Sequence, residues 1–202
     1  MFKQCLQTQI LLLLALPIIL IGFTIGFYFK QHGVLPDESK WCIWDCGWYN
    51  GMREHGYIYK PNQQNNLAFF PLFPLVWKTL NIGNIGIGII NYVVFALAAI
   101  LMARHYQIAT KTIFMFMAVG LSFFFMVPYT ESFFFLGSVL ILLGFSKNNY
   151  WYLVFGALIA IGTRSASMIF LVSFVWMLLI AFLQQKKWAD INFVCHACCV
   201  CS

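Results

Sequence analysis

Ile82 to Ala103 reads IGNIGIGIINYVVFALAAILMA and contains no charged side chain. An apolar helix of about 20 residues is long enough to cross the hydrocarbon core of a bilayer. The chain as a whole has the same character, because 62% of its 202 residues are hydrophobic and only 9% are charged, whereas soluble domains carry about 25% charged residues. We therefore expect an all-α polytopic membrane protein.

Similar apolar runs lie on both sides of this stretch. The run nearest the N-terminus, residues 10–29, lacks a small-residue cleavage site, which favours an uncleaved span over a signal peptide. Several runs are shorter than about 20 residues, so bent or partly protein-lined helices are expected among them. We expect about six transmembrane helices in one domain of residues 1–190, at 10–29, 82–103, 112–127, 132–145, 150–162 and 167–183.

The basic residues bear on partners and on orientation. The formal net charge is +6, but the twelve Lys and Arg are scattered singly apart from Lys186 and Lys187, which excludes a basic patch for nucleic acid. With a cytoplasmic N-terminus, parity places residues 30–81, 128–131 and 163–165 on one outer face. The positive-inside rule does not decide the orientation, because the twelve basic residues divide six to six between the two sides.

The first outer loop, residues 30–81, contains the most unusual stretch, Trp41 to Tyr57, which reads WCIWDCGWYNGMREHGY. Pro36 followed by two acidic residues predicts a helix start, and Gly56 predicts its stop. Trp and Tyr are favoured where a membrane meets water. We therefore expect an amphipathic helix that lies at the membrane interface.

On such a helix Asp45 shares its face with aromatic side chains. At 100° per residue its neighbours on that face are Trp41, Trp48, Tyr49 and Met52. A carboxylate taken out of water must be paired, protonated or used. Interfacial helices carry aromatic residues without any catalysis, but that alternative does not explain an acid among them. Asp45 is therefore the candidate catalytic residue.

The seven cysteines divide by position. Cys42 and Cys46 lie four residues apart, and such pairs on one helix seldom satisfy disulfide geometry. We expect them to be small packing residues. Four more cysteines crowd the atypical tail, residues 191–202, with no second spaced pair, so a truncated or out-of-frame tail is favoured over a metal site.

Three further segments interrupt the apolar pattern. Residues 65–74, NNLAFFPLFP, carry two prolines three apart, which forbid a regular helix and predict a bend; a cavity wall and a plain loop into the next span both fit. Glu131 follows Thr130 in a corner between spans and is either a first-turn acid of a capped helix or a site residue. Arg164, in GTRSAS, is expected to pair with an acid or a lipid phosphate, or else to snorkel.

Four of these blocks resemble, in order, the conserved blocks of the PIG-V family of membrane mannosyltransferases, typified by the enzyme that adds the second mannose in glycosylphosphatidylinositol assembly. They are WDCGWYNGMREHGY, AFFPLFPL, VPYTESFFF and the arginine of GTRSAS, and they cover residues 41–164. Members of the family are longer than this chain, which therefore looks truncated. The chain also departs from the family after Arg164, where Ser165 to Ser167 replace a common asparagine and glycine.

The resemblance implies a glycosyltransferase of the GT-C type. Such an enzyme moves a hexose, here mannose, from a polyprenyl phosphate to a hydroxyl of a lipid-linked or cell-surface glycan, with inversion and usually without a nucleotide sugar. We expect no cofactor and assign no metal ligand. Asp45 matches the family's first-loop aspartate and would be the general base, its pKa raised by burial among tryptophans. Arg164 would hold the lipid phosphate. The other residues expected to line the site are Trp44, Trp48, Tyr49, Tyr129 and Glu131.

Two other functions fit the same composition. A non-catalytic membrane subunit is favoured by the short chain. A flippase or transporter for lipid-linked sugars would place its ionisable groups near the middle of the bilayer, whereas here they cluster at one rim. The expected location is a prokaryotic plasma membrane rather than the endoplasmic reticulum.

Overall fold

The computed structural model describes residues 22–23, 25–34, 37–109, 112, 115, 124–169, 172–173 and 175–176. Throughout these ranges every regular element is a helix, which confirms the all-α prediction for this part of the chain. After a helical segment at 25–32, the order is η1 (Glu38–Trp41), α2 (Cys46–His55), η2 (Asn66–Ala68), α3 (Leu72–Leu80), α4 (Asn84–His105), α6 (Glu131–Lys147), α7 (Tyr150–Thr163) and η4 (Ser165–Ser167).

Helix α4 is the predicted central span, and it begins two residues later than expected. It has 22 residues and a mean hydropathy of 2.4 over its most apolar window, so it is long and apolar enough to cross a membrane. Arg104 and His105 lie in its last turn, where cations complement the helix dipole. The described ranges contain this one candidate membrane-spanning helix, and they do not establish the expected six.

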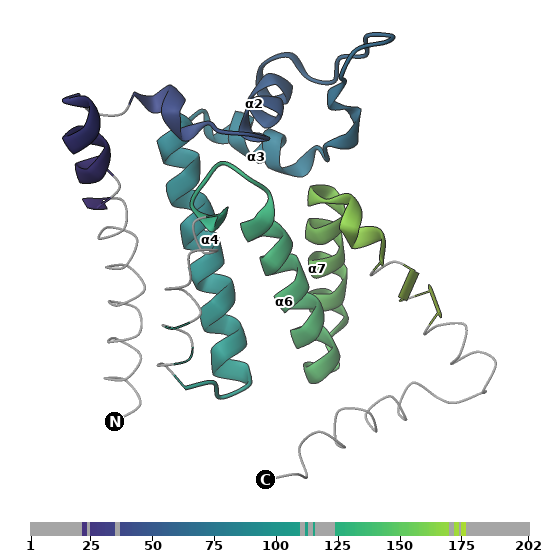
Figure 1. Cartoon of the computed structure of the whole chain (residues 1–202). Helices are drawn as coiled ribbons and strands as arrows, with labels where there is room; N and C mark the ends of the chain where they lie inside the picture. The colour runs from purple at the N-terminus through teal and green to yellow at the C-terminus, as the bar shows by residue number, and fades with distance from the viewer. Residues whose placement is uncertain are drawn as a thin grey trace.

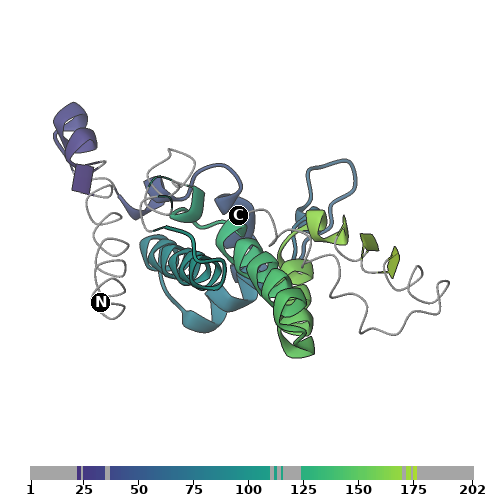
Figure 2. The same ribbon diagram turned by 90° about the horizontal axis from the view of Figure 1, so that it is seen from below.

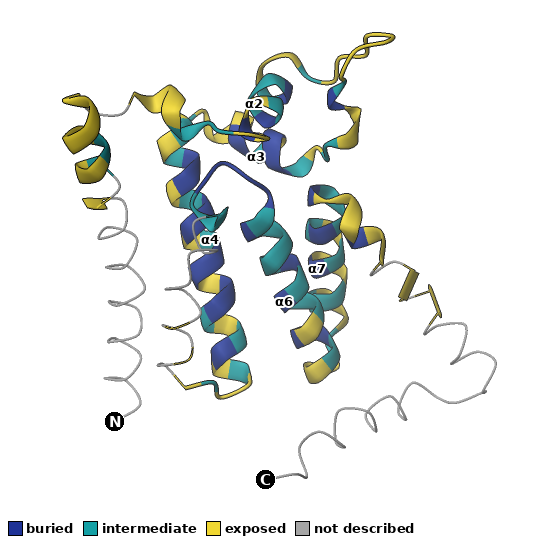
Figure 3. Ribbon diagram, viewed as in Figure 1, coloured by how far each residue is buried: buried dark blue, intermediate teal, exposed yellow. Residues whose placement is uncertain are grey.

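The exposed side of α4 is apolar along its whole length. Every fourth residue from 85 to 101 keeps between 40% and 54% of its surface exposed, while residues on the other side are buried (Figure 3). A helix that is apolar on its exposed side is typical of contact with lipid or with another apolar surface. The exposed residues are Ile85, Ile89, Val93, Leu97 and Leu101.

Helices α6 and α7 form an antiparallel hairpin that matches two of the predicted runs. They approach at glycines: a Cβ added to Gly137 would lie 2.8 Å from the carbonyl oxygen of Gly156, and one added to Gly156 would lie 2.8 Å from that of Gly137. Such backbone contact is typical of small-residue packing between membrane helices. Helix α6 also contacts α4, and Figures 1 and 2 show the three helices as one group.

The outer loop differs from the single helix predicted to run to Gly56. Asp37 caps the short helix η1, which ends at Trp41, and the chain is not helical again until α2 begins at Cys46. The stop at Gly56 is confirmed, with a φ of 74° that favours glycine. The face proposed for Asp45 was therefore wrong, because Trp41 is not one helical turn before it.

The segment with two prolines also differs from the prediction. It bends before Pro71, as expected, but α3 then starts at Leu72 and includes Pro74. Proline is tolerated in the first turn, because the amide groups there have no partner within the helix. Helix α3 packs against α2 and α7 (Figure 1). The expectation that the two prolines forbid a regular helix was therefore wrong, as was the plain-loop alternative, and the cavity wall stays a prediction.

The remaining predictions fall mainly outside the described residues. This applies to the expected spans at 10–29, 112–127 and 167–183, of which only parts are described, and to the cysteine-rich tail at 191–202.

Candidate functional site

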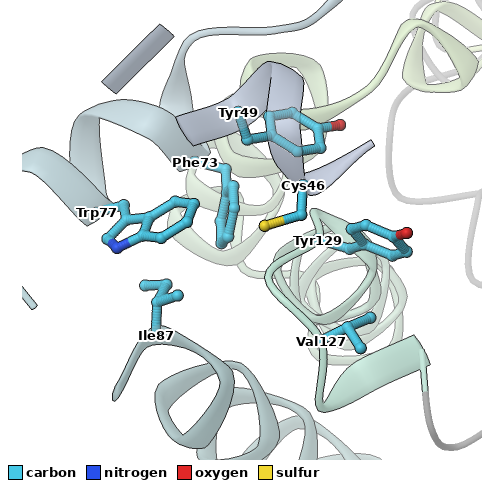
Figure 4. Close-up of a cluster of buried hydrophobic side chains, with 7 residues drawn as sticks. All are labelled: Cys46, Tyr49, Phe73, Trp77, Ile87, Val127 and Tyr129. Carbon is cyan, nitrogen blue, oxygen red and sulfur yellow. The ribbon is translucent and has the colours of Figure 1, made fainter. Parts of the chain in front are cut away.

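A cluster of buried side chains joins the outer loop to the start of α4 and to the corner before α6. It combines side chains of α2, α3 and α4 with those of the corner that precedes α6 (Figure 4). In Figure 4 the hydroxyl groups of Tyr49 and Tyr129 point to the same side of the cluster, away from Trp77. The apolar cluster therefore has one polar side. Its buried members are Cys46, Tyr49, Phe73, Trp77, Ile87, Val127 and Tyr129.

The corner before α6 is fixed to α4 by a buried amide. The side chain of Asn91, which is 0% exposed, donates hydrogen bonds from Nδ2 to the carbonyl oxygens of Val127 at 2.6 Å and Tyr129 at 2.9 Å. Polar groups buried in an apolar setting need such partners. The apolar run at 82–103 contains two asparagines, and the one in its middle, Asn91, was an available signal that the prediction did not use.

Tyr129 connects this corner to the segment that carries Asp45. Its hydroxyl donates a hydrogen bond to the carbonyl oxygen of Ile43 at 2.9 Å, and its side chain is buried. Burial raises the pKa of Tyr129 to about 12, and the negative charges of Asp45 and Glu131 act in the same direction. Tyr129 was expected to line the site; the structure places its hydroxyl between the corner and the loop.

Cys42 and Cys46 form a disulfide bond, so their interpretation as packing residues was wrong. The spacing argument assumed a helix through both positions, but the chain turns between them and brings their Cα atoms to 5.1 Å, which is within the range for a disulfide. The bond encloses Ile43, Trp44 and Asp45. Within this ring Trp44 has a φ of 47°, a conformation that costs energy for a residue other than glycine.

Asp45 is exposed, and its expected burial among tryptophans was wrong. It occupies the N-cap position of α2, where its carbonyl oxygen accepts hydrogen bonds from the amides of Trp48 at 3.0 Å and Tyr49 at 3.3 Å. Its carboxylate makes no capping hydrogen bond. The charge of this carboxylate nevertheless acts on the hydroxyls of Tyr49 and Tyr129, so Asp45 lies on the polar side of the cluster.

Glu131 and Arg164 form an ion pair, so of the alternatives stated for this arginine the structure shows pairing with an acid. Nη1 of Arg164 lies 2.6 Å from Oε1 of Glu131, and the side chains are 43% and 26% exposed. Glu131 is the first residue of α6, where the helix dipole favours a negative charge. Oε2 of Glu131 is buried and has no hydrogen-bond partner among the described residues. Among the described residues, the pair therefore leaves Oε2 of Glu131 without a hydrogen-bond partner, and part of the Arg164 side chain stays exposed to solvent.

Tyr49 and Thr130 connect α2 to the same corner. Their hydroxyl oxygens are 3.4 Å apart in a buried position. Burial raises the pKa of Tyr49, and the charge of Glu131 also raises it. Thr130 makes no side-chain cap on α6, so the capped-helix interpretation of this corner does not hold for its hydroxyl. Thr130 was not among the predicted site residues.

The two predicted tryptophans stack on other rings. The exposed ring of Trp44 stacks on Phe124 at 6.1 Å between ring centroids, and the half-buried ring of Trp48 stacks on Phe69 at 5.9 Å. Phe124 also stacks on Tyr129 at 6.3 Å. Flat aromatic surfaces therefore stand next to Asp45 in the chain. Neither phenylalanine was singled out from the sequence.

The arrangement offers an exposed carboxylate, an ion pair with an accessible guanidinium group, and aromatic surfaces at one end of the helices. Among the described residues there is no group of three or more His, Cys, Asp or Glu side chains that could hold a metal ion. Comparison of the chain with protein-family models, with curated protein sequences and with solved structures found no match.

Proposed function

We propose that the chain is a multi-pass membrane glycosyltransferase that moves a hexose, mannose by resemblance, from a polyprenyl phosphate to a hydroxyl of a glycan or glycolipid acceptor. The observation that carries the proposal is that three charged groups lie around the same buried hydroxyl, that of Tyr49. They are the exposed carboxylate of Asp45 and the pair of Glu131 and Arg164, and all three charges act on that hydroxyl. An acid that is open to an acceptor and a cation suited to a phosphate are the two charged groups that this reaction requires.

Asp45 is the general base in this proposal. The acceptor hydroxyl gives its proton to the carboxylate while its oxygen forms a bond to the anomeric carbon of the sugar. The bond between that carbon and the phosphate oxygen breaks, and polyprenyl phosphate leaves with the electron pair. Attack from the side opposite the phosphate inverts the anomeric centre. The absence of a capping hydrogen bond leaves the carboxylate of Asp45 available for this proton.

Arg164 binds the leaving phosphate in this proposal. Its guanidinium group presents a planar set of donors that suits phosphate oxygens. Glu131 holds Nη1 of that group at 2.6 Å and so fixes its direction, while the 43% exposure of the arginine side chain leaves room for a second anion. Glu131 begins α6 and Arg164 follows α7, so the pair lies at the ends of both helices, which this proposal assigns to the rim of the membrane.

The aromatic residues recognise the sugar and the interface. Flat rings stack against the apolar faces of sugars, and Trp44 is 70% exposed beside Asp45. The apolar outer sides of α4 and α7 support the multi-pass arrangement, because Trp151, Phe155 and Leu158 of α7 are exposed at 69%, 54% and 62%. A prokaryotic plasma membrane is the proposed location, with the site on its outer face. The donor is a substrate, and no cofactor is part of the proposal.

The test compares two aspartates of the same loop. Asp45→Asn should lower transfer from polyprenyl-phosphate mannose by about 100-fold or more, as expected for loss of a general base, while insertion into the membrane is unchanged. Asp37→Asn is the matched control, because Asp37 is also exposed but bonds to Ser39 and to the amide of Glu38. Native rates with Asp45→Asn would remove this residue from the mechanism.

A further inference from the structure

The disulfide between Cys42 and Cys46 has no part in the proposed transfer, yet it encloses the residue on which that transfer depends. We propose that this disulfide is a positioning element for Asp45, and that a dithiol switches the site off by reducing it. The link to catalysis rests on the proposed function. The positioning of the loop does not.

The other contacts of the enclosed segment are non-covalent: Trp44 stacks on Phe124, and the carbonyl oxygens of all three enclosed residues accept hydrogen bonds. Within the ring the amide of Cys46 donates a hydrogen bond to the carbonyl oxygen of Ile43 at 3.1 Å. Just after the ring, the amide of Gly47 donates one to the carbonyl oxygen of Trp44 at 3.4 Å. The left-handed φ of Trp44 is unfavourable for a bulky residue, so the segment keeps it only while its surroundings enforce it. The disulfide is the covalent part of those surroundings.

The segment is also held from outside by the hydroxyl of Tyr129, which donates a hydrogen bond to the carbonyl oxygen of Ile43 at 2.9 Å. Cys46 is 0% exposed and packs in the cluster with Tyr129, so it anchors one end of the ring, whereas Cys42 is only half-buried at the other end. When the bond opens, Cys42 loses its covalent link to Cys46 and keeps only its packing against the edge of the cluster. The turn that presents Asp45 then depends on hydrogen bonds and on the stacking of Trp44 alone.

The difference in burial between the two cysteines also determines which sulfur atom the dithiol attacks during thiol–disulfide exchange. A thiolate of the dithiol attacks Sγ of Cys42, which is the more accessible sulfur, and forms a mixed disulfide. Cys46 leaves as a thiolate with the electron pair of the broken bond, at the first residue of α2, where the helix terminus stabilises a negative charge. The second thiol of the reagent then releases Cys42. Two electrons and two protons have reached the protein, and the reagent has become a cyclic disulfide.

The first experiment measures the state of the two cysteines in the full chain in native membranes. Trypsin cuts after Lys40 and Arg53, and the peptide between them contains both cysteines and one carboxyl side chain, that of Asp45. A maleimide added under denaturing conditions should leave this peptide unmodified before treatment with dithiothreitol and should modify it twice afterwards. Double modification without dithiothreitol would overturn the proposal.

The second experiment measures the loop itself by hydrogen exchange and by carbodiimide labelling of the same peptide. Reduction should speed amide exchange at Cys46 and Gly47 at least tenfold, change the labelling rate of Asp45, and leave the amides of α4 unchanged. The Cys42→Ser/Cys46→Ser double variant should show the faster exchange with and without dithiothreitol. If exchange and labelling in the native chain do not respond to reduction, the disulfide does not position Asp45.

The third measurement separates this inference from the proposed function. With polyprenyl-phosphate mannose as donor, reduction should lower kcat at least tenfold with little change in KM, and reoxidation should restore it. Unchanged kcat in a reduced chain that transfers sugar would show that the ring does not control catalysis. If the oxidised chain transfers no sugar, the proposed function fails, and exchange and labelling alone decide whether the disulfide positions the loop.

Discussion

Replacing Asn91 tests whether one amide fixes the corner that leads to the candidate site. In Asn91→Leu the buried carbonyl oxygen of Tyr129 loses its donor, while that of Val127 loses one of two donors and keeps the amide of Tyr129 at 2.7 Å. Each buried group left without a partner costs about 1–3 kcal/mol. Part of this is offset, because the Oδ1 atom of Asn91, itself buried without a partner among the described residues, is removed as well. We expect a net loss of about 2–3 kcal/mol.

The measurement is thermal unfolding of the full chain in detergent, followed by tryptophan fluorescence. For a chain of this size about 1 kcal/mol corresponds to a shift in Tm of about 2–4 °C, so Asn91→Leu should unfold roughly 5–10 °C below the native chain. Asn84→Leu is the matched control on the same helix, since the bond from Asn84 to the carbonyl oxygen of Glu38 is exposed, and its Tm should change by less than about 3 °C.

Asn91→Asp sharpens the test. It keeps the shape of the side chain but replaces the donor with an oxygen that faces two carbonyl oxygens, so it should be at least as destabilising as Asn91→Leu. A native Tm for Asn91→Leu would refute the reasoning, because it would mean that the two carbonyl groups find other partners and that the corner does not depend on α4.

Three other predictions follow from the packing, the ionisation and the charges. Gly137→Ala or Gly156→Ala should be less stable than the control Gly51→Ala by about 1–3 kcal/mol in thermal unfolding, because a Cβ at Gly51 meets nothing within 4 Å; equal stability would contradict the close packing. The raised pKa of Tyr129 stabilises the fold below about pH 10 and ceases to do so as the pH rises to about 12, so unfolding free energy should fall more steeply with pH above 10 in the native chain than in Tyr129→Phe, and parallel curves would be the contrary result. Arg164→Gln should lower kcat for sugar transfer about 100-fold with Arg164→Lys intermediate, and equal rates for both variants would exclude a role for the charge.

The local features of the sequence predicted much of the fold. The apolar run at 82–103 became α4 with a shift of two residues, and the runs at 132–145 and 150–162 became α6 and α7, because length and hydropathy act within one segment. For Arg164 an acidic partner was one of three alternatives, since a cation in so apolar a setting needs a partner, and the sequence did not name Glu131 as that partner. Both groups stand at helix ends, where a topological argument can place them.

The segment around Asp45 could not be predicted in the same way. Helical periodicity was extended from Pro36 to Gly56, but a disulfide and a left-handed Trp44 interrupt it. The same turn also receives a hydrogen bond from Tyr129, which lies 86 positions from Ile43 in the chain. Pattern and propensity contain no such information. The exposure of Asp45 is a consequence of this turn.

The contact between Gly137 of α6 and Gly156 of α7 determines how far Glu131, at the start of α6, lies from Arg164, at the end of α7. An α-helix rises about 1.5 Å and turns about 100° with each residue, so one residue inserted between Gly137 and Glu131 would move Glu131 along α6 by more than half of the 2.6 Å that separates it from Arg164 and rotate it away. The hairpin thus acts as a spacer of fixed length. The number of residues between the glycine contact and the rim, and not only the chemistry at the rim, decides where the positive charge meets its carboxylate.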